Sequence, residues 1–176
     1  MRQRHAIAAA LAAALLTAPL SGVAAPAAPA ASAEPAAPRT EGYGTSPQTL
    51  HGSADDLALR GVRVVERRGG DRIVIRFRGN GRPGAVVHYV RRAVADGSGE
   101  VLDVAGGAIL QVDVAGTPLT RHQRPVHVRT GGDLVDVEAA GPFEGYTQVF
   151  LGLEERTAFR AKARSGPSRI VIDLKN

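Results

Sequence analysis

Hydrophobic and polar residues alternate in two stretches of the chain that resemble each other. In the sequence DRIVIRFRG, residues 71–79, large apolar side chains occupy every second position, and three arginines and one valine take the positions next to them. The sequence SRIVIDL, residues 168–174, repeats the pattern near the C-terminus. A repeat of two residues is typical of a strand with one face buried and the other exposed. We therefore predict two matching core strands of one all-β domain, with Ile73, Ile75 and Phe77 pointing inward.

Further short stretches with strand patterns follow one another, separated by glycine-containing turns. The stretches expected to be extended are residues 63–67, 71–79, 85–92, 101–104, 108–114, 134–138, 146–153, 158–163 and 169–174. The turn RGGD at residues 68–71 predicts an antiparallel hairpin between the first two of them. Residues 115–130 contain two prolines and no sustained period, which indicates a long loop. About eight or nine short strands at this spacing favour a sandwich or barrel.

The N-terminal part of the chain has the composition of an export signal and a tether. A basic start, an apolar run at residues 6–20 and small residues at 23–25 predict a signal peptide over residues 1–25. The alternative is a membrane anchor, but this run is shorter than the roughly 20 apolar residues that span a bilayer. Residues 26–56 are rich in Ala, Pro, Gly and Ser and predict a disordered tether. We therefore expect a secreted or cell-wall-associated protein, without a transmembrane segment after cleavage, whose folded domain covers residues 57–176.

Positive charge is concentrated in the first part of the expected domain. Residues 60–92 hold ten arginines against two acidic residues, whereas residues 93–176 hold nine basic residues against eleven acidic ones. Alternation places several arginines on the solvent side of the first hairpin, and a guanidinium fork suits bidentate contact with carboxylate or phosphate. The predicted binding residues are Arg63, Arg67, Arg72, Arg76 and Arg78. The alternative is a solvated face that keeps the protein soluble.

The sequence gives little support for disulfides, a catalytic nucleophile, a metal site or nucleic-acid binding. The chain contains no cysteine, which excludes disulfides, thiolate metal sites and a cysteine nucleophile. Ser98 stands between two glycines and is expected in a turn rather than in a nucleophile elbow. His122 and His127 lie among arginines that would repel a divalent cation, so we expect no metal site. Because stacking aromatics are missing from the basic strands, nucleic acid is not an expected partner. We expect a non-enzymatic protein without a cofactor.

Several short motifs in a fixed order resemble one protein family. They are GVR (61–63), DRIV (71–74), ADGSG (95–99), VAGGAILQV (104–112), FEG (143–145), GL (152–153), FR (159–160) and RIVID (169–173). This order is similar to the AMIN-like domain of exported proteins from high-GC Gram-positive bacteria and, more distantly, to the AMIN domain of cell-wall amidases. The resemblance covers about residues 59–174. It implies a β-sandwich of two antiparallel sheets and a targeting or glycan-binding role in the envelope.

Together, these patterns predict a free-standing binding module, since no amidase domain follows in this sequence. The expected ligand is peptidoglycan or a phosphate-bearing wall polymer, bound by the arginine-rich sheet face. The alternative is a protein-interaction module that recruits or regulates a wall enzyme through the loop at residues 118–129.

Overall fold

The computed structural model describes residues 42–119 and 126–175. These residues form antiparallel strands and connecting turns, and none of them is helical. The described part of the chain contains twelve strands: β1 (Gln48–Leu50), β2 (Ala58–Val65), β3 (Arg72–Arg78), β4 (Ala85–Val90), β5 (Ala93–Val94), β6 (Val101–Leu102), β7 (Ala108–Ala115), β8 (His127–Arg129), β9 (Leu134–Ala139), β10 (Tyr146–Leu153), β11 (Ala158–Arg164) and β12 (Arg169–Lys175).

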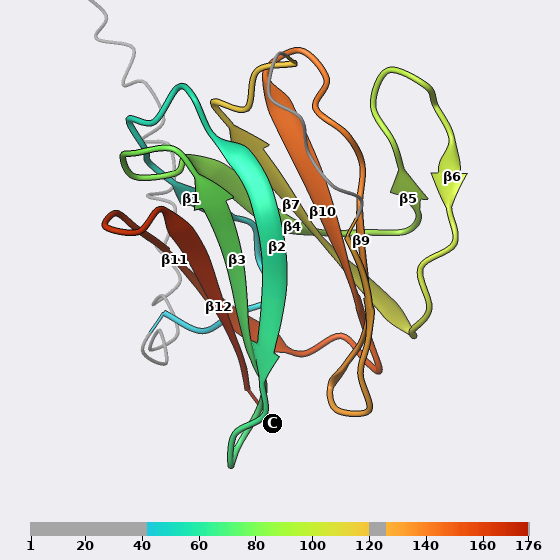
Figure 1. Cartoon of the computed structure of the whole chain (residues 1–176). Helices are drawn as coiled ribbons and strands as arrows, with labels where there is room; N and C mark the ends of the chain where they lie inside the picture. Colours follow the sequence, from blue (N-terminus) through green and yellow to red (C-terminus); the bar gives the residue numbers. More distant parts are fainter. Residues whose placement is uncertain (1–41, 120–125, 176) are drawn as a thin grey trace, which may run out of the picture. The chain divides into compact units, whose positions relative to one another are not determined.

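The strands form two larger sheets and one small one (Figure 1). Six strands pair in the order β1-β4-β7-β10-β9-β8, four in the order β11-β12-β3-β2, and β5 pairs with β6. Buried side chains from both larger sheets belong to one hydrophobic cluster, so the sheets are two layers around a shared core. The cluster includes Ile73 and Ile75 of β3 together with Val112 of β7 and Leu151 of β10.

The two look-alike stretches are neighbouring central strands of the four-stranded sheet. Ile73 of β3 lies opposite Ile172 of β12, and Ile75 lies opposite Ile170. All four side chains are fully buried. The prediction of two matching core strands in an all-β protein with antiparallel sheets is therefore confirmed.

The prediction of eight or nine strands is wrong, because the described residues contain twelve. The strands not foreseen are β1, β5 and β8, which have two or three residues each. Such short strands cannot show a period of two, and their partners define them rather than their own sequence. β8 forms inside the predicted loop by pairing with β9. The strand β2 also begins at Ala58, earlier than expected, with a bulge between Leu59 and Gly61.

The structure differs from the predicted tether at residues 42–56. β1 pairs with β4, and Gly44 exchanges two backbone hydrogen bonds of 3.0 Å with Phe159 of β11. The side chain of Gln48 extends this link, since its amide nitrogen donates to the carbonyl of Phe159 at 2.8 Å. These backbone and amide contacts fix a segment whose own composition has no apolar face. The predicted signal peptide and residues 26–41 lie outside the described residues.

A segment that contains β5 and β6 lies against the outer side of β10. The backbone N–H of Asp96 donates to the Gln148 side chain at 2.7 Å, and Ala105 N–H donates to Asp136 at 3.0 Å. Gly152 has no room for a side chain there, because a Cβ would lie 1.9 Å from the Ala105 carbonyl oxygen. This covering explains why Phe150 is fully buried although it alternates to the outer face. Within residues 42–119 and 126–175, no helix has the length and apolar character needed to cross a membrane.

Candidate functional site

Basic side chains are concentrated on the outer face of the four-stranded sheet, where strand pairing makes them neighbours. On β11, β12 and β3, buried side chains such as Phe159, Ile170 and Ile73 alternate with residues that face away from the core. The residues on this outer side, called the basic face below, are Arg160, Lys162 and Arg164 of β11, Arg169, Val171 and Asp173 of β12, Arg72, Val74, Arg76 and Arg78 of β3, and Arg63 of β2.

Strand register lines up three arginines across three neighbouring strands. Arg164 lies opposite Arg169, and Arg169 lies opposite Arg76. Neighbouring strands are about 4.8 Å apart, so the backbones that carry these three arginines lie within about 10 Å of one another. Like charges directly opposite each other destabilise a sheet. This arginine row, Arg164, Arg169 and Arg76, is therefore a local concentration of charge that the fold maintains against repulsion.

The next level of the face has apolar residues at its centre and cations at its ends. Val171 lies opposite Val74 in the middle of the sheet, and both are half-buried. Lys162 lies beside Val171 on β11, and Arg63 lies beside Val74 on β2. The two valines, called the valine floor below, thus have basic neighbours on both sides as well as in the arginine row.

At the third level of the basic face, a carboxylate neutralises the arginines on either side of it. Asp173 is 7% exposed and lies between Arg160 and Arg72. Arg72 donates two hydrogen bonds to this carboxylate, from Nε to Oδ1 and from Nη2 to Oδ2 at 2.9 Å. Arg160 Nη2 donates to Oδ2 at 3.2 Å. The hydrogen bond to Asp173 raises the pKa of Arg72. Burial alone would raise the pKa of Asp173, but the hydrogen bonds from Arg72 and Arg160 and their charges lower it below its usual 3.8.

The basic face is hollowed rather than flat. A shallow depression of about 590 Å³ lies over β11, β12 and β3. Its lining residues are Arg72, Val74, Arg160, Lys162, Arg164, Ser165, Arg169, Val171 and Asp173. The arrangement presents guanidinium and ammonium donors around an apolar centre, which is suited to holding an anion by charge and hydrogen bonds.

Of the five predicted binding residues, only Arg72 lines this depression. Arg63, Arg72, Arg76 and Arg78 share the basic face, although Arg72 is held by Asp173. Arg67 is exposed in the β2–β3 turn and lines a smaller hollow of about 180 Å³ next to Tyr43 and Arg72. Arg78 lies opposite Ala58 at the end of β3, outside both hollows.

Four basic residues of the face were missed by the sequence analysis. They are Arg160, Lys162, Arg164 and Arg169. A signal was present, because AFRAKAR at residues 158–164 alternates as strictly as the first stretch. The net charge of residues 93–176 does not reveal this basic strand, because acidic residues in turns outweigh it.

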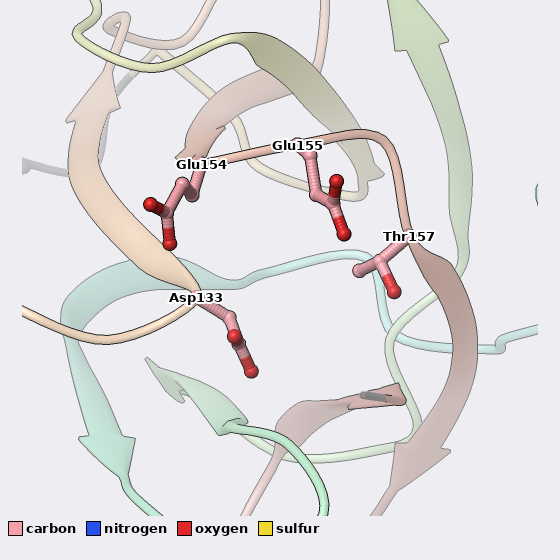
Figure 2. Close-up of a pocket in the computed structure, with 4 residues that line it drawn as sticks. All are labelled: Asp133, Glu154, Glu155 and Thr157. Carbon is pink, nitrogen blue, oxygen red and sulfur yellow. The ribbon is translucent and has the colours of Figure 1, made fainter.

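A second hollow, of about 380 Å³, is acidic (Figure 2). It is lined by Asp133, Glu154, Glu155 and Thr157. Glu154 and Glu155 are exposed and lie in the turn between β10 and β11, where Glu154 N–H donates to the Asp133 carbonyl at 2.9 Å. In the part of the chain that the structure describes, no group of three or more His, Asp or Glu residues is arranged to hold a metal ion.

The remaining candidate residues have local structural contacts. Ser98 lies in a turn, as predicted, and its hydroxyl accepts a hydrogen bond of 3.2 Å from Glu100 N–H. His127 on β8 contacts the Glu138 carboxylate of β9. His122 lies outside the described residues.

Comparison with known proteins identifies the family. The model of the AMIN-like domain matches residues 57–176. A search of curated proteins gave no match, and a search of solved structures gave none. The matched range contains β2 to β12 and therefore every residue of the basic face. The chain belongs to the AMIN-like domain family.

Proposed function

We propose that the protein is a secreted, non-catalytic module of the cell envelope that binds an anionic wall polymer on its basic face. Membership of the AMIN-like family supports a cell-wall-related binding role. The β-sandwich formed by the two larger sheets supplies a rigid support, because the core side chains of β3 and β12 are fully buried directly beneath the face. The ligand supplies the negative charge that the face lacks.

The arginine row is the observation that carries this proposal. Arg164, Arg169 and Arg76 come from three strands, and strand pairing holds their backbones next to one another. On this face Asp173 is the carboxylate partner of Arg72 and Arg160, at one side of the depression. A face that only kept the protein soluble would be more stable with the two signs of charge interspersed. A bound polyanion would relieve the repulsion within the row.

Sedimentation with purified cell walls tests the proposal. Wild-type protein should pellet with walls at low salt and should be released as NaCl rises, because ions screen contacts between exposed charges. The variant Arg76→Gln/Arg164→Gln/Arg169→Gln should stay in the supernatant. The matched control Arg91→Gln/Arg92→Gln/Arg129→Gln removes the same charge from exposed positions outside the four-stranded sheet and should pellet like the wild type. If a folded arginine-row variant pellets as well as the control, the basic face is not the binding site.

The protein-interaction alternative has its own support in a cluster of exposed apolar side chains. Leu119 is 68% exposed at the start of the loop at residues 118–129, of which 120–125 lie outside the described residues. The neighbouring Thr117 N–H donates to Gly145 at 3.0 Å, in the turn that carries the exposed Phe143 and Tyr146. Such a patch suits a protein partner. Sedimentation with walls stripped of protein distinguishes the two functions. If the protein binds the wall polymer, it should pellet with these walls as well as with untreated ones.

Two further parts of the proposal can be tested separately. Secretion predicts that the mature protein, beginning near residue 25, is found in the medium or wall fraction. The absence of catalysis predicts that purified protein releases no soluble fragments from labelled peptidoglycan. Fragment release by the wild type alone would replace the binding module with an enzyme.

A further inference from the structure

The valine floor restricts the kinds of ligand that suit the basic face. Val74 and Val171 are directly opposite each other in the lining of the depression. Arg169 and Arg76 lie two residues away along the same strands, while Lys162 and Arg63 lie on the adjoining strands. An apolar centre with cations around it favours a ligand whose anionic groups are separated by carbon-bearing units. The carbon units can cover the valines while the anionic groups contact the donors.

The hydrogen-bonding groups of the face point to the kind of anion. Arginine and lysine side chains offer donors and no acceptors, and valine side chains offer neither. The carboxylate of Asp173 is already engaged by Arg72 and Arg160. A peptide would bring backbone N–H groups, and any free amine a positive charge, to a surface that has few acceptors for them. Phosphate oxygens only accept, and a polyol hydroxyl can rotate to accept as well.

We infer that the basic face takes a phosphodiester-linked polyol or sugar polymer, with phosphates at the arginine row and at Lys162 or Arg63 and carbon skeleton over the valine floor. This inference rests on the proposed function and names its ligand class. Arg164 and Arg76 can each direct N–H groups to one phosphate or to two successive phosphates. Arg169 can do so with the nitrogens other than Nη1, which donates to the Pro167 carbonyl at 2.9 Å. Asp173 limits the ligand on the third level, because it occupies Nε and Nη2 of Arg72 and Nη2 of Arg160 and repels a phosphate placed there.

Calorimetric titration of the mature chain with three soluble polyanions tests the inference. The probes are poly(glycerol phosphate), polyphosphate and poly-L-glutamate, matched for the number of negative charges per chain. Wild-type protein should bind poly(glycerol phosphate) at least 10-fold more tightly than poly-L-glutamate. The variant Val74→Thr/Val171→Thr keeps the side-chain shape but adds hydroxyls to the floor. It should bind poly(glycerol phosphate) several-fold more weakly, with polyphosphate binding unchanged.

The possible failures are distinguishable. Equal affinity for poly-L-glutamate, or a threonine variant with unchanged affinity for poly(glycerol phosphate), would overturn the ligand class while the anion-binding function stands. Tighter binding to vesicles of phosphatidylglycerol than to the soluble polymer would assign the phosphate to a lipid surface and would also overturn it. Binding to none of the three polyanions would remove both the inference and the proposed function. Thermal unfolding of each variant shows that a loss of binding is not a loss of fold.

Discussion

The basic face and the acidic hollow are both depressions lined by side chains of one dominant charge, but they are built differently. Regular strands supply the basic face, so the register between β11, β12 and β3 determines which cations are neighbours. The acidic hollow is formed where β9 begins and where β10 turns into β11 (Figure 2), and two of its three carboxylates are on exposed turn residues. Carboxylates in a turn can separate in solvent, whereas strand residues stay opposite one another. The comparison indicates that regular strand pairing, unlike a turn, holds charged residues at fixed neighbouring positions.

Reversing one charge in each region should give the largest difference between them. Arg169 is the centre of the arginine row, and Arg169→Glu would place a carboxylate between Arg164 and Arg76. We expect polyanion affinity to fall on the order of 100-fold, which corresponds to about 2.7 kcal/mol. The matched reversal Glu154→Arg in the acidic hollow should change affinity less than threefold. Calorimetric titration with one polyanion compares the two, and similar losses would mean that net charge alone controls binding.

Removing the carboxylate within the basic face should have opposite effects on stability and binding. Asp173→Asn leaves Arg72 and Arg160 without their ionic partner. Because the carboxylate is mostly buried and the arginines are partly exposed, we expect the free energy of unfolding to fall by about 1–2 kcal/mol. Polyanion affinity should rise several-fold at low salt, since two guanidinium groups become available. Urea denaturation and titration measure the two effects; a loss of affinity in the folded variant would contradict the role assigned to Asp173.

The same ion pairs predict a dependence of stability on pH. The pKa of Asp173 is lowered in the folded protein, so its contribution is present above the unfolded value near 3.8 and is lost as the pH falls through the lower folded value. The stability difference between wild type and Asp173→Asn should therefore be constant from about pH 5 to 7 and should shrink below about pH 4. Urea denaturation at several pH values tests this, and a difference that persists unchanged at pH 2 would contradict the ion pairing.

Neutralising the acidic turn should have the smallest effect. Glu154 and Glu155 are exposed, and surface substitutions of this kind usually change stability by less than about 0.5 kcal/mol. The variant Glu154→Gln/Glu155→Gln should keep the wild-type unfolding curve and bind polyanion within about twofold of the wild type. A large gain in affinity would show that the acidic hollow repels the ligand from nearby, and would make the two regions parts of one electrostatic surface.

The parts of the fold that sequence predicted are those whose own pattern determines their structure. Strict alternation in β3 and β12 was sufficient to identify the core strands and their buried isoleucines. β1 and β8 could not be identified in this way, because pairing with β4 and β9 defines them.

The basic face was predicted only in part for a related reason. Alternation showed that Arg72 and Arg76 point outward, but it could not show which residues lie next to them. Arg169 becomes the neighbour of Arg76 through long-range strand register, and Asp173 neutralises Arg72 through the same register. Arg78 faces outward as alternation predicted, but it lies at the end of β3, and Arg67 lies in the β2–β3 turn, so neither lines the depression.

We propose that an anionic polymer binds to the outer face of β11, β12 and β3. The most direct test is a titration followed by ¹H–¹⁵N NMR. Addition of poly(glycerol phosphate) should shift backbone amides of residues 72–76, 160–165 and 169–173, together with the arginine Nε–H signals of that face. Amides around Glu154, Glu155 and Phe143 should remain unchanged. Shifts confined to the turn at residues 143–146, or no shifts at saturating polymer, would contradict the account.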